Sequence, residues 1–504
     1  MAMEKRIQVF PGFFFVCKNS FLLIKHLHFC YNSYGAFIPI IFLGGDTMNW
    51  VKQLLAPPPA QPLRDDATVR QLYPRYRVRV FIGIFVGYMG YYFVRNTTAV
   101  LSGILQMSAT QIGIISCASY VAYGISKFVS GHIADSSNAK IFLPLGLVLS
   151  GIVNILIGVI PGIISTVWIF TVMYLINGWL QGMGYGPCSR SLVYWFDDEE
   201  RTLWGSIWNL AHNFGGALAP ALAGLGLAIA GNNAMARAHA AYWLPGIVVI
   251  IIAVFVYFIQ EDTPESVGMP SVEQYHHLPA KKQPAAVPPM KAVIREYILP
   301  NKKLLWACMY GAFVYVLRYG IVVWAPRFLA APQSVGGKAV NAAAGMGGFS
   351  FFEIGGVLGM LCAMMICRKV FNNSMPLTNV AFLVLTMVLV VIYWFIPAGN
   401  QYLLADYAVL IGLGFGIYGP VMTIGLYAMG IVPKIAAGAA AGLSGTFSYV
   451  LGAVIATLVI GIIADHMGWL AVFGLFIIAA IGAIICTLLS RDKRLEGFHQ
   501  SQES

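Results

Sequence analysis

The sequence has few charged residues and none of the local patterns that mark common enzymes. Only 10% of its 504 residues are charged, whereas a water-soluble domain carries about a quarter. It contains no Walker loop, no nucleophile elbow and no run of His, Cys and carboxylate residues at metal-ligand spacing. We therefore expect no enzyme, such as a membrane phosphatase, no cofactor and no metal site.

Paired cysteines and a basic stripe are also missing. The eight cysteines form no Cys-x-x-Cys pair and fall mostly within apolar runs, which is typical of small buried side chains rather than disulfides or metal ligands. The net charge of +11 comes from basic residues scattered over loops, and nucleic-acid binding would need them gathered on one face. We expect no nucleic-acid partner.

Long apolar runs are what the sequence has in abundance, since 59% of its residues are hydrophobic. Twelve of these runs are long enough to cross a bilayer about 30 Å thick as helices. They predict an all-α membrane protein with twelve transmembrane helices in two six-helix halves. The spans lie at about 80–102, 112–134, 141–160, 165–187, 203–230, 240–259, 304–325, 344–367, 377–396, 403–430, 435–463 and 470–490.

The longest polar segment, which is rich in proline, divides the spans six and six. The predicted parts are a cytoplasmic N-terminal segment at 1–78, two six-helix halves at 79–260 and 303–491, a linker at 261–302 and a tail at 492–504. One large class of transporters builds a site at the bilayer midplane between two such halves.

The first 47 residues have apolar runs interrupted by basic residues. We interpret residues 1–47 as an upstream extension of the reading frame, with a more regular start at Met48; the alternative is a thirteenth span near 28–45.

Loop charges predict the orientation. With the N-terminus inside, the outer loops carry only Arg237, Arg327 and Lys338, and the many other loop Lys and Arg residues lie inside. Positive charge accumulates on the cytoplasmic side of membrane proteins. We therefore expect a multi-pass protein with both termini in the cytoplasm.

Two arginines occupy matching positions in the two halves. Arg95 lies 16 residues after Arg79, and Arg318 lies 15 residues after Lys303, which places both roughly 22–24 Å into a helix. An intramembrane arginine is costly and indicates a functional site. The alternatives are that it extends to the interface or pairs with a carboxylate. Because Glu353 is the one acid well inside a predicted span, the pair predicts an anion site.

Six motifs, in order along residues 65–495, resemble those of the organophosphate:phosphate antiporters of the major facilitator superfamily. They lie at 91–95, 123–128, 181–188, 208–216, 317–321 and 418–422. The segment 131–140, Gly-x-x-x-Asp followed by a basic residue, also resembles the superfamily's signature loop. Its counterpart has Arg368 where an acid is usual, so a gating salt bridge there is in doubt.

The resemblance implies that Arg95 and Arg318 are phosphate ligands, and guanidinium geometry agrees because it matches phosphate oxygens in pairs. It also implies that His212 is a third ligand; the alternative is a buried histidine bonded to a helix carbonyl. Lys127 is either an entry ligand or a side chain that extends to the interface. Glu353 either pairs with Arg318 or binds substrate hydroxyls. The other expected substrate-binding residues are Tyr88, Tyr92, Tyr123, Trp208, Asn209, Tyr315, Tyr418 and Tyr449.

The predicted function is exchange of inorganic phosphate for an organic phosphate ester by a monomer in the bacterial cytoplasmic (inner) membrane. The alternatives are a hexose-phosphate antiporter and a transporter-like membrane sensor of sugar phosphates. Ala441 and Ser444 stand where hexose-phosphate carriers have an acid and a lysine. Because these small residues offer a sugar few hydrogen-bond partners, glycerol-3-phosphate is the expected ester.

Several glycines predict close helix packing. Gly182, Gly184 and Gly186 fall in the fourth span. Gly438, Gly442 and Gly445 fall in the eleventh, where we expect a sliding surface between spans.

Overall fold

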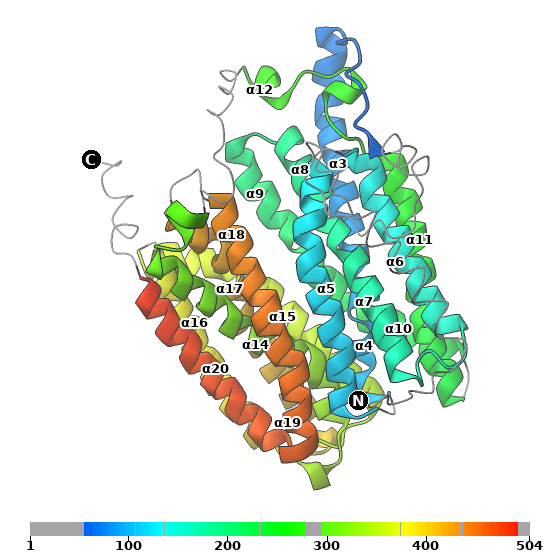
Figure 1. The fold of residues 1–504 in the computed structure, drawn as a ribbon, viewed down its shortest axis with the longest axis vertical. Helices are drawn as coiled ribbons and strands as arrows, with labels where there is room; N and C mark the ends of the chain where they lie inside the picture. Colours follow the sequence, from blue (N-terminus) through cyan, green and yellow to red (C-terminus); the bar gives the residue numbers. More distant parts are fainter. Residues whose placement is uncertain are drawn as a thin grey trace, which may run out of the picture. The chain divides into compact units, whose positions relative to one another are not determined.

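The computed structural model describes residues 55–105, 107–135, 137–230, 233–277, 294–372, 374–432 and 437–491, and in these ranges it contains helices and no strand (Figure 1). The first half comprises α3 (Asp66–Arg95), α4 (Thr97–Val100), α5 (Ala109–Asp135), α6 (Ala139–Val159), α7 (Val167–Gln181), α8 (Tyr185–Trp195), α9 (Asp198–Asn209), α10 (Ala211–Ile229) and α11 (Ala234–Ile259). The second comprises α14 (Lys302–Ala330), α15 (Ala342–Lys369), α16 (Met375–Phe395), α17 (Leu403–Gly430), α18 (Ala437–Thr446), α19 (Ile460–Met467) and α20 (Trp469–Ser490).

Short elements complete the two halves. Tight 3₁₀ turns, η1 (Leu101–Gly103) and η2 (Gly182–Gly184), interrupt or end spans of the first half, and α12 (Val272–Tyr275) lies between the halves. Two π-helical segments, η8 (Phe447–Ala453) and η9 (Ile455–Val459), separate α18 from α19. The predicted upstream extension or thirteenth span, Met48 and the tail at 492–504 lie outside the described residues.

Eleven helices in the described ranges are long and apolar enough to cross a membrane. The remaining predicted span is broken: α7 ends at Gln181, η2 turns, and α8 continues. A Cβ at Gly182 would lie 2.4 Å from Ser126 Oγ, and one at Gly184 would lie 2.7 Å from a ring carbon of Tyr91. These glycines therefore pack closely as expected, and the twelve segments agree with the predicted twelve-helix fold.

The first helix is longer at its start than the predicted span and shorter at its end. It begins at Asp66, capped by the Asp65 carboxylate, which accepts a hydrogen bond from the Thr68 backbone N–H. It ends at Arg95, because Asn96 leaves the helical conformation before α4 begins. Arg95 is thus the last helical residue rather than one in the middle of a continuous span.

The helices alternate in direction, so the bundle has two ends. We call the end at Asp66, Ala139, Ile259 and Lys302 the linker end, and the end at Val159, Ala330 and Met467 the far end (Figure 1).

Ion pairs join the elements of the first half at the linker end. Asp262, just after α11, forms a buried ion pair with Arg190 on α8 at 3.1 Å, and it also accepts from the Ala139 backbone N–H at the start of α6. Glu261 pairs with Arg79 and Lys140. The side chain of Asp135 lies outside the description, and Arg368 in the second half is exposed.

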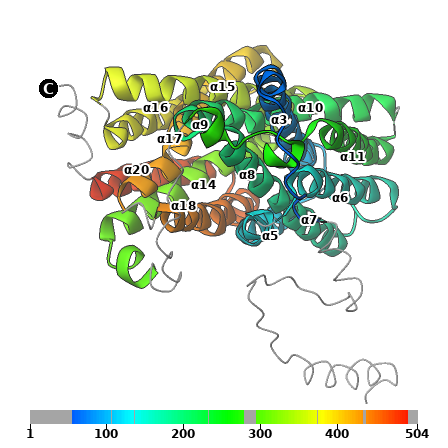
Figure 2. The same cartoon turned by 90° about the horizontal axis from the view of Figure 1, so that it is seen from above.

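The two halves lie side by side in Figure 2. They meet through α10 with α15 and through α5 with α19. Polar contacts close the far end: the Asp465 carboxylate accepts from the backbone N–H groups of Ala109 at 2.9 Å and Thr110 at 2.7 Å. The Ser102 hydroxyl donates to the Val323 carbonyl at 3.1 Å. Contacts across the halves therefore include a carboxylate at the start of a helix, where the helix dipole favours negative charge.

The expected sliding surface on the eleventh span is wrong for the two glycines whose surroundings are described. A Cβ at Gly442 or at Gly445 would meet no other atom within 4 Å. The reason is that α18 leaves these positions open, whereas close approach to the first half occurs farther along. Thr457 lies against Gly113, where a Cβ would be 2.5 Å from the Thr457 carbonyl oxygen.

Candidate functional site

Arg95 is buried at the end of α3 against two aromatic faces. Its guanidinium carbon lies 4.3 Å from the centre of the Tyr92 ring and 4.2 Å from that of Tyr123 on α5. Its Nε donates to Gln181 Oε1 on α7 at 3.1 Å. Desolvated cation–π contacts of this kind are each worth about 2 kcal/mol, and a helix C-terminus also favours a cation. Ring faces and an amide therefore hold the arginine in place, and no carboxylate of the described ranges pairs with it.

Arg318 is buried in the middle of α14 and lies near three tyrosines. Its guanidinium carbon is 4.8 Å from the ring centre of Tyr418, 5.1 Å from that of Tyr319 and 5.5 Å from that of Tyr315. Its Nη1 donates to the Tyr315 hydroxyl at 3.5 Å, a long contact. Ring faces therefore hold this arginine more than hydrogen bonds do.

A row of rings connects the two arginines through His212. The imidazole centre lies 5.7 Å from the ring of Tyr92, which contacts Arg95, and 5.8 Å from that of Tyr418, which contacts Arg318. His212 sits in the first turn of α10, just after the helix breaks at Leu210. The sequence-predicted ligands from the two halves thus belong to one cluster.

A second row connects them on another side. Tyr123, in contact with Arg95, lies 4.9 Å from Tyr449 by ring centres, and Tyr449 lies 5.1 Å from Tyr315. Tyr449 is on the π-helical segment η8, and such irregular turns are frequent at functional sites. The two rows surround the space between the guanidinium groups with tyrosine rings and hydroxyls.

Several buried donors in this cluster have no partner in the described part of the chain. They are both Nη atoms of Arg95, Nε of Arg318, Nε2 of His212 and the hydroxyls of Tyr123 and Tyr319. Each unpaired buried polar group costs about 1–3 kcal/mol, and more when it is charged. Donors left unpaired around two cations form a site that can bind a multivalent oxyanion.

Glu353 does not pair with Arg318: no ion pair joins them among the described residues, and that alternative is wrong. Its carboxylate accepts from the Tyr418 hydroxyl at 2.8 Å and from Asn213 Nδ2 at 2.9 Å. Asn213 belongs to α10 and Glu353 to α15, so this hydrogen bond crosses between the halves. Both of its carboxylate oxygens therefore have a neutral partner.

Lys127 points into the protein instead of extending to the interface. Its Nζ lies 3.8 Å from the centre of the Tyr185 ring and 6.0 Å from that of Tyr449. Because α5 continues to Asp135, Lys127 lies about two turns before the helix end. It stands at the edge of the tyrosine cluster on the linker side.

Of the remaining expected residues, some border the tyrosine cluster and others pack elsewhere. Tyr88 contacts Tyr92 and Trp208, with ring centres 5.7 Å and 4.7 Å apart, and so borders the cluster. The Trp208 indole donates to the Ile84 carbonyl at 3.3 Å. Trp208 on α9 therefore packs against α3. The Asn209 amide contacts the Met360 sulfur at 3.8 Å and none of the arginines or tyrosines of the cluster.

Sequence reasoning did not name four residues of the cluster as binding residues, although Gln181 and Tyr319 lie within the motifs at 181–188 and 317–321. Gln181 binds Arg95, and Asn177 donates to the Val94 carbonyl beside it. Tyr120 lies 4.3 Å from Tyr319 by ring centres, next to Arg318. An amide inside an apolar helix is costly, so Gln181 and Asn177 carried a signal, whereas the tyrosines resembled ordinary packing residues.

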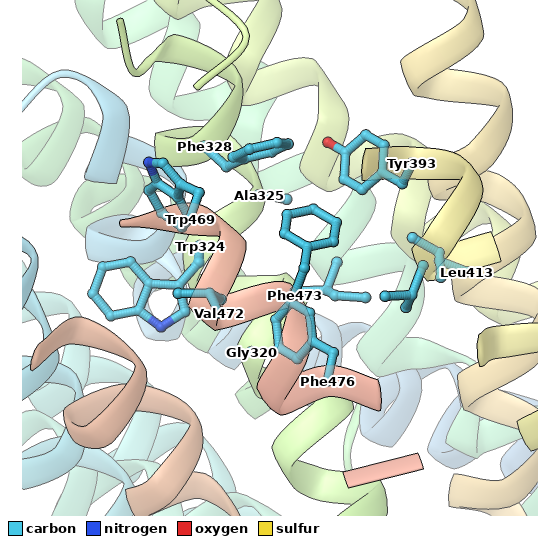
Figure 3. A pocket seen from close by; sticks show the side chains of 12 residues that line it. Gly320, Trp324, Ala325, Phe328, Tyr393, Leu413, Trp469, Val472, Phe473 and Phe476 are labelled. Carbon is cyan, nitrogen blue, oxygen red and sulfur yellow. The ribbon is translucent and has the colours of Figure 1, made fainter. Parts of the chain in front are cut away.

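Two other features do not form a substrate site. The cavity in Figure 3 measures about 20 Å³, and its walls are almost wholly apolar side chains such as Trp324, Phe328 and Phe473. Asp197, Glu200 and His276 approach within 4.8 Å of one another, although the sequence showed no such cluster because His276 is distant along the chain. Glu200 is already ion-paired with Arg77, so a cation there would compete with the arginine.

Comparisons with known proteins agree with this architecture. The chain is 37% identical to the glycerol-3-phosphate transporter of Bacillus subtilis (strain 168) over 443 residues, 87% of this chain and 97% of that protein. It is 38% identical to the glycerol-3-phosphate transporter of Haemophilus influenzae, covering 85% and 94%. It is 33% identical to a probable hexose phosphate transport protein of Chlamydia pneumoniae, covering 87% and 96%.

A solved structure shares the fold. The crystal structure of a bacterial homologue of the human lysosomal transporter Spinster, inward-facing and occupied, matches with a TM-score of 0.60 at 12% identity, covering 84% of this chain and 96% of that one. The relatives are named as transporters, in keeping with the expectation that the chain is not an enzyme. The sequence pattern of the Major Facilitator Superfamily matches residues 80–452, and the chain belongs to this superfamily of multi-pass membrane proteins.

Proposed function

We propose that this protein exchanges inorganic phosphate for an organic phosphate ester by alternating access. The observation that carries the proposal is the pair of buried arginines, Arg95 and Arg318, which share one cluster, retain unpaired donors and form no ion pair within the described residues. A phosphate dianion supplies the charge and the acceptor oxygens that these donors lack. Both relatives named as glycerol-3-phosphate transporters point to the same class of cargo.

The side chains around the arginines have separate roles in this proposal. The unpaired Nε2 of His212 is the third phosphate ligand. A protonated imidazole donates from both nitrogens, so the dianion binds the imidazolium form. The wall and further hydroxyl donors come from Tyr88, Tyr92, Tyr123, Tyr315, Tyr418 and Tyr449. Lys127 receives the anion at the linker side, and Glu353 accepts from substrate hydroxyls.

The positive charges of the two buried arginines would make transport an exchange rather than a one-way movement. Closing both ends of the protein around Arg95 and Arg318 without an anion would desolvate two like charges, at a cost of several kcal/mol. A bound dianion offsets that cost in the closed form. The loaded carrier therefore reorients readily and the empty carrier does not, which couples the outward movement of one phosphate to the inward movement of another.

The proposed setting is the cytoplasmic (inner) membrane of a bacterium, with the protein working as a monomer. Basic residues concentrate at the linker end, as with Arg70, Arg75, Arg77 and Arg79 on the extended α3. Under the positive-inside rule this end faces the cytoplasm, and both chain termini then lie on that side. The far end, closed by Asp465 and Ser102, faces outward.

Glycerol-3-phosphate is the proposed ester. Ser444 lies near Gly311 on α14, two turns before Arg318, which is roughly 10 Å along the helix. A lysine at residue 444 could offer a charged donor to the hydroxyls of a larger sugar, whereas a serine offers less. The side chain of Ala441, the other residue behind this expectation, lies outside the description.

The test is phosphate counterflow in liposomes that contain the purified protein. We expect labelled phosphate to enter only when phosphate or an ester is present inside, and glycerol-3-phosphate to compete at a lower concentration than glucose-6-phosphate. Stronger competition by glucose-6-phosphate would transfer the assignment to a hexose-phosphate antiporter. Ligand binding without any exchange, in a sample that contains folded protein, would instead indicate a sensor.

A further inference from the structure

The first and sixth spans pack tightly through glycines near the middle of the bundle. A Cβ at Gly87 would lie 3.3 Å from Val256 Cγ2 on α11, and a Cβ at Gly90 would lie 3.2 Å from Ile252 Cγ2. Such glycines let two helix backbones approach closely. Both glycines lie on one face of α3. Nearer the linker end, residues of α3 line a groove instead.

Nearer the linker end, α3 and α11 together border a surface groove of about 500 Å³. It is lined by Pro74, Arg75, Val78, Arg79 and Ile82 of α3 and by Phe255 and Ile259 of α11. Its apolar walls are exposed in the protein alone: Val78 is 53% exposed, Phe255 44% and Ile82 42%. Both helices are long and apolar enough to cross a membrane, and exposed apolar walls of this kind are suited to contact with acyl chains.

The mouth of the groove is basic. Arg79 donates from Nε to the Ile259 carbonyl at 2.9 Å and from Nη2 to the Phe258 carbonyl at 2.8 Å, which fixes its guanidinium at the end of α11. Glu261 accepts from both Arg79 and Lys140. In the part of the chain that the structure describes, the exposed Arg75 side chain forms no hydrogen bond and no ion pair. Three cations and one carboxylate leave the mouth positive.

We propose that this groove binds an anionic glycerophospholipid from the leaflet at the linker end. The phosphate of the headgroup contacts Arg75 and Arg79, and one acyl chain lies along Val78, Ile82 and Phe255. A free phosphate would satisfy the arginines but leave the apolar walls uncovered, and a zwitterionic lipid would cover the walls but leave the positive charge uncompensated. Basic grooves between membrane helices are suited to anionic headgroups for this reason.

The bound lipid would therefore contact α3, the helix that ends at Arg95. It would bridge α3 and α11 at the point where their glycine contact ends, and it would be retained when the protein is purified. This role is separate from phosphate exchange, because Arg79 and Arg75 lie roughly four and a half and five and a half helical turns from Arg95 along α3.

The experiment is native mass spectrometry of the full chain with added phosphatidylglycerol or phosphatidylcholine. We expect the first tightly bound lipid to be phosphatidylglycerol, retained at least about tenfold better than phosphatidylcholine. Arg75→Gln should lower this retention about fivefold or more. The matched control is Arg70→Gln, which removes another exposed arginine of α3 that does not line the groove.

A second variant tests the apolar wall. Val78→Trp fills the groove and keeps every charge, and we expect it to reduce retention of phosphatidylglycerol as well. Equal losses in the Arg70 and Arg75 variants would overturn the proposal in favour of diffuse charge attraction. Equal retention of both lipids, or displacement of phosphatidylglycerol by inorganic phosphate, would overturn it too.

Discussion

The two halves of this protein each bury one arginine at the centre, but they hold it differently. Arg95 is the last residue of a helix that breaks at Asn96, and a side-chain amide from Gln181 orients it. Arg318 lies inside the unbroken helix α14, surrounded by tyrosine rings and with one long hydrogen bond. Ring faces therefore hold the charge in both halves, and Arg95 adds a hydrogen bond of ordinary length where Arg318 has only a long one.

This difference shows that repeated halves need not repeat their chemistry. A hydrogen bond fixes the plane of a guanidinium group, whereas ring faces attract the charge and allow it to turn. We infer that Arg95 is a fixed ligand and that Arg318 adapts to the cargo. The predictions below test how far the two sides differ.

Replacing either arginine by lysine should have the largest effect. Lysine keeps the charge but loses the paired donors, so we expect Arg95→Lys and Arg318→Lys each to lower phosphate exchange at least about 100-fold. Counterflow in liposomes measures this loss, and thermal unfolding in detergent checks that both variants fold. Exchange at the parent rate in either folded variant would show that the site does not need two guanidinium groups.

His212 tests whether the two sides act together, since its ring contacts Tyr92 on one side and Tyr418 on the other. Glutamine can donate one hydrogen bond but carries no charge. We expect His212→Gln to weaken phosphate binding about 30-fold, within the range for a hydrogen bond to a charged group. Isothermal titration with phosphate measures this affinity. An affinity within about twofold of the parent would make His212 a packing residue.

Two matched variants test the contrast directly. Gln181→Leu removes the directional bond to Arg95, and we expect about a tenfold loss of exchange. Tyr315→Phe removes only the hydroxyl at 3.5 Å from Arg318 and keeps its ring, so exchange should fall less than about twofold. Both rates come from the same counterflow assay. The inferred difference between the arginines fails if the tyrosine variant loses as much as the glutamine variant.

The last variant tests the far end, away from both arginines. Asp465→Ala removes the carboxylate that accepts from two backbone N–H groups of α5. Such a helix cap is worth about 1 kcal/mol, so forms with an open far end should increase about fivefold. Electron paramagnetic resonance distances between labels at Ser165 and Gln401 report this opening. An unchanged distance distribution would show that the carboxylate does not hold the halves together.

The sequence was sufficient for the fold and for the arginine positions because both depend on local information. Hydropathy predicted the twelve segments, and spacing from the preceding basic residues predicted that Arg95 and Arg318 lie deep in the protein. Both side chains are buried in the structure. The start of α3 was missed because its first turns are polar, so hydropathy could not detect a helix that a cap at Asp65 begins.

Partners across the chain could not be predicted in the same way. The carboxylate of Glu353 binds Tyr418 and Asn213, and the choice among these and Arg318 depends on how helices rotate and pack. Gly442 and Gly445 show the same limit, since small residues permit a close contact but do not require it. Whether the predicted ligands bind phosphate stays a prediction for the experiments above.

The turn at Gly182–Gly184 has a consequence for topology mapping. A count of long apolar helices gives eleven, and an odd number would place the start of α3 and the end of α20 on opposite membrane faces. When the broken fourth segment is counted as a span, the number of spans is twelve. The start of α3 and the end of α20 then lie on the same membrane face. A reporter fused after Gln181 would sit within the membrane rather than in a loop, and its signal would mislead a map drawn from hydropathy alone.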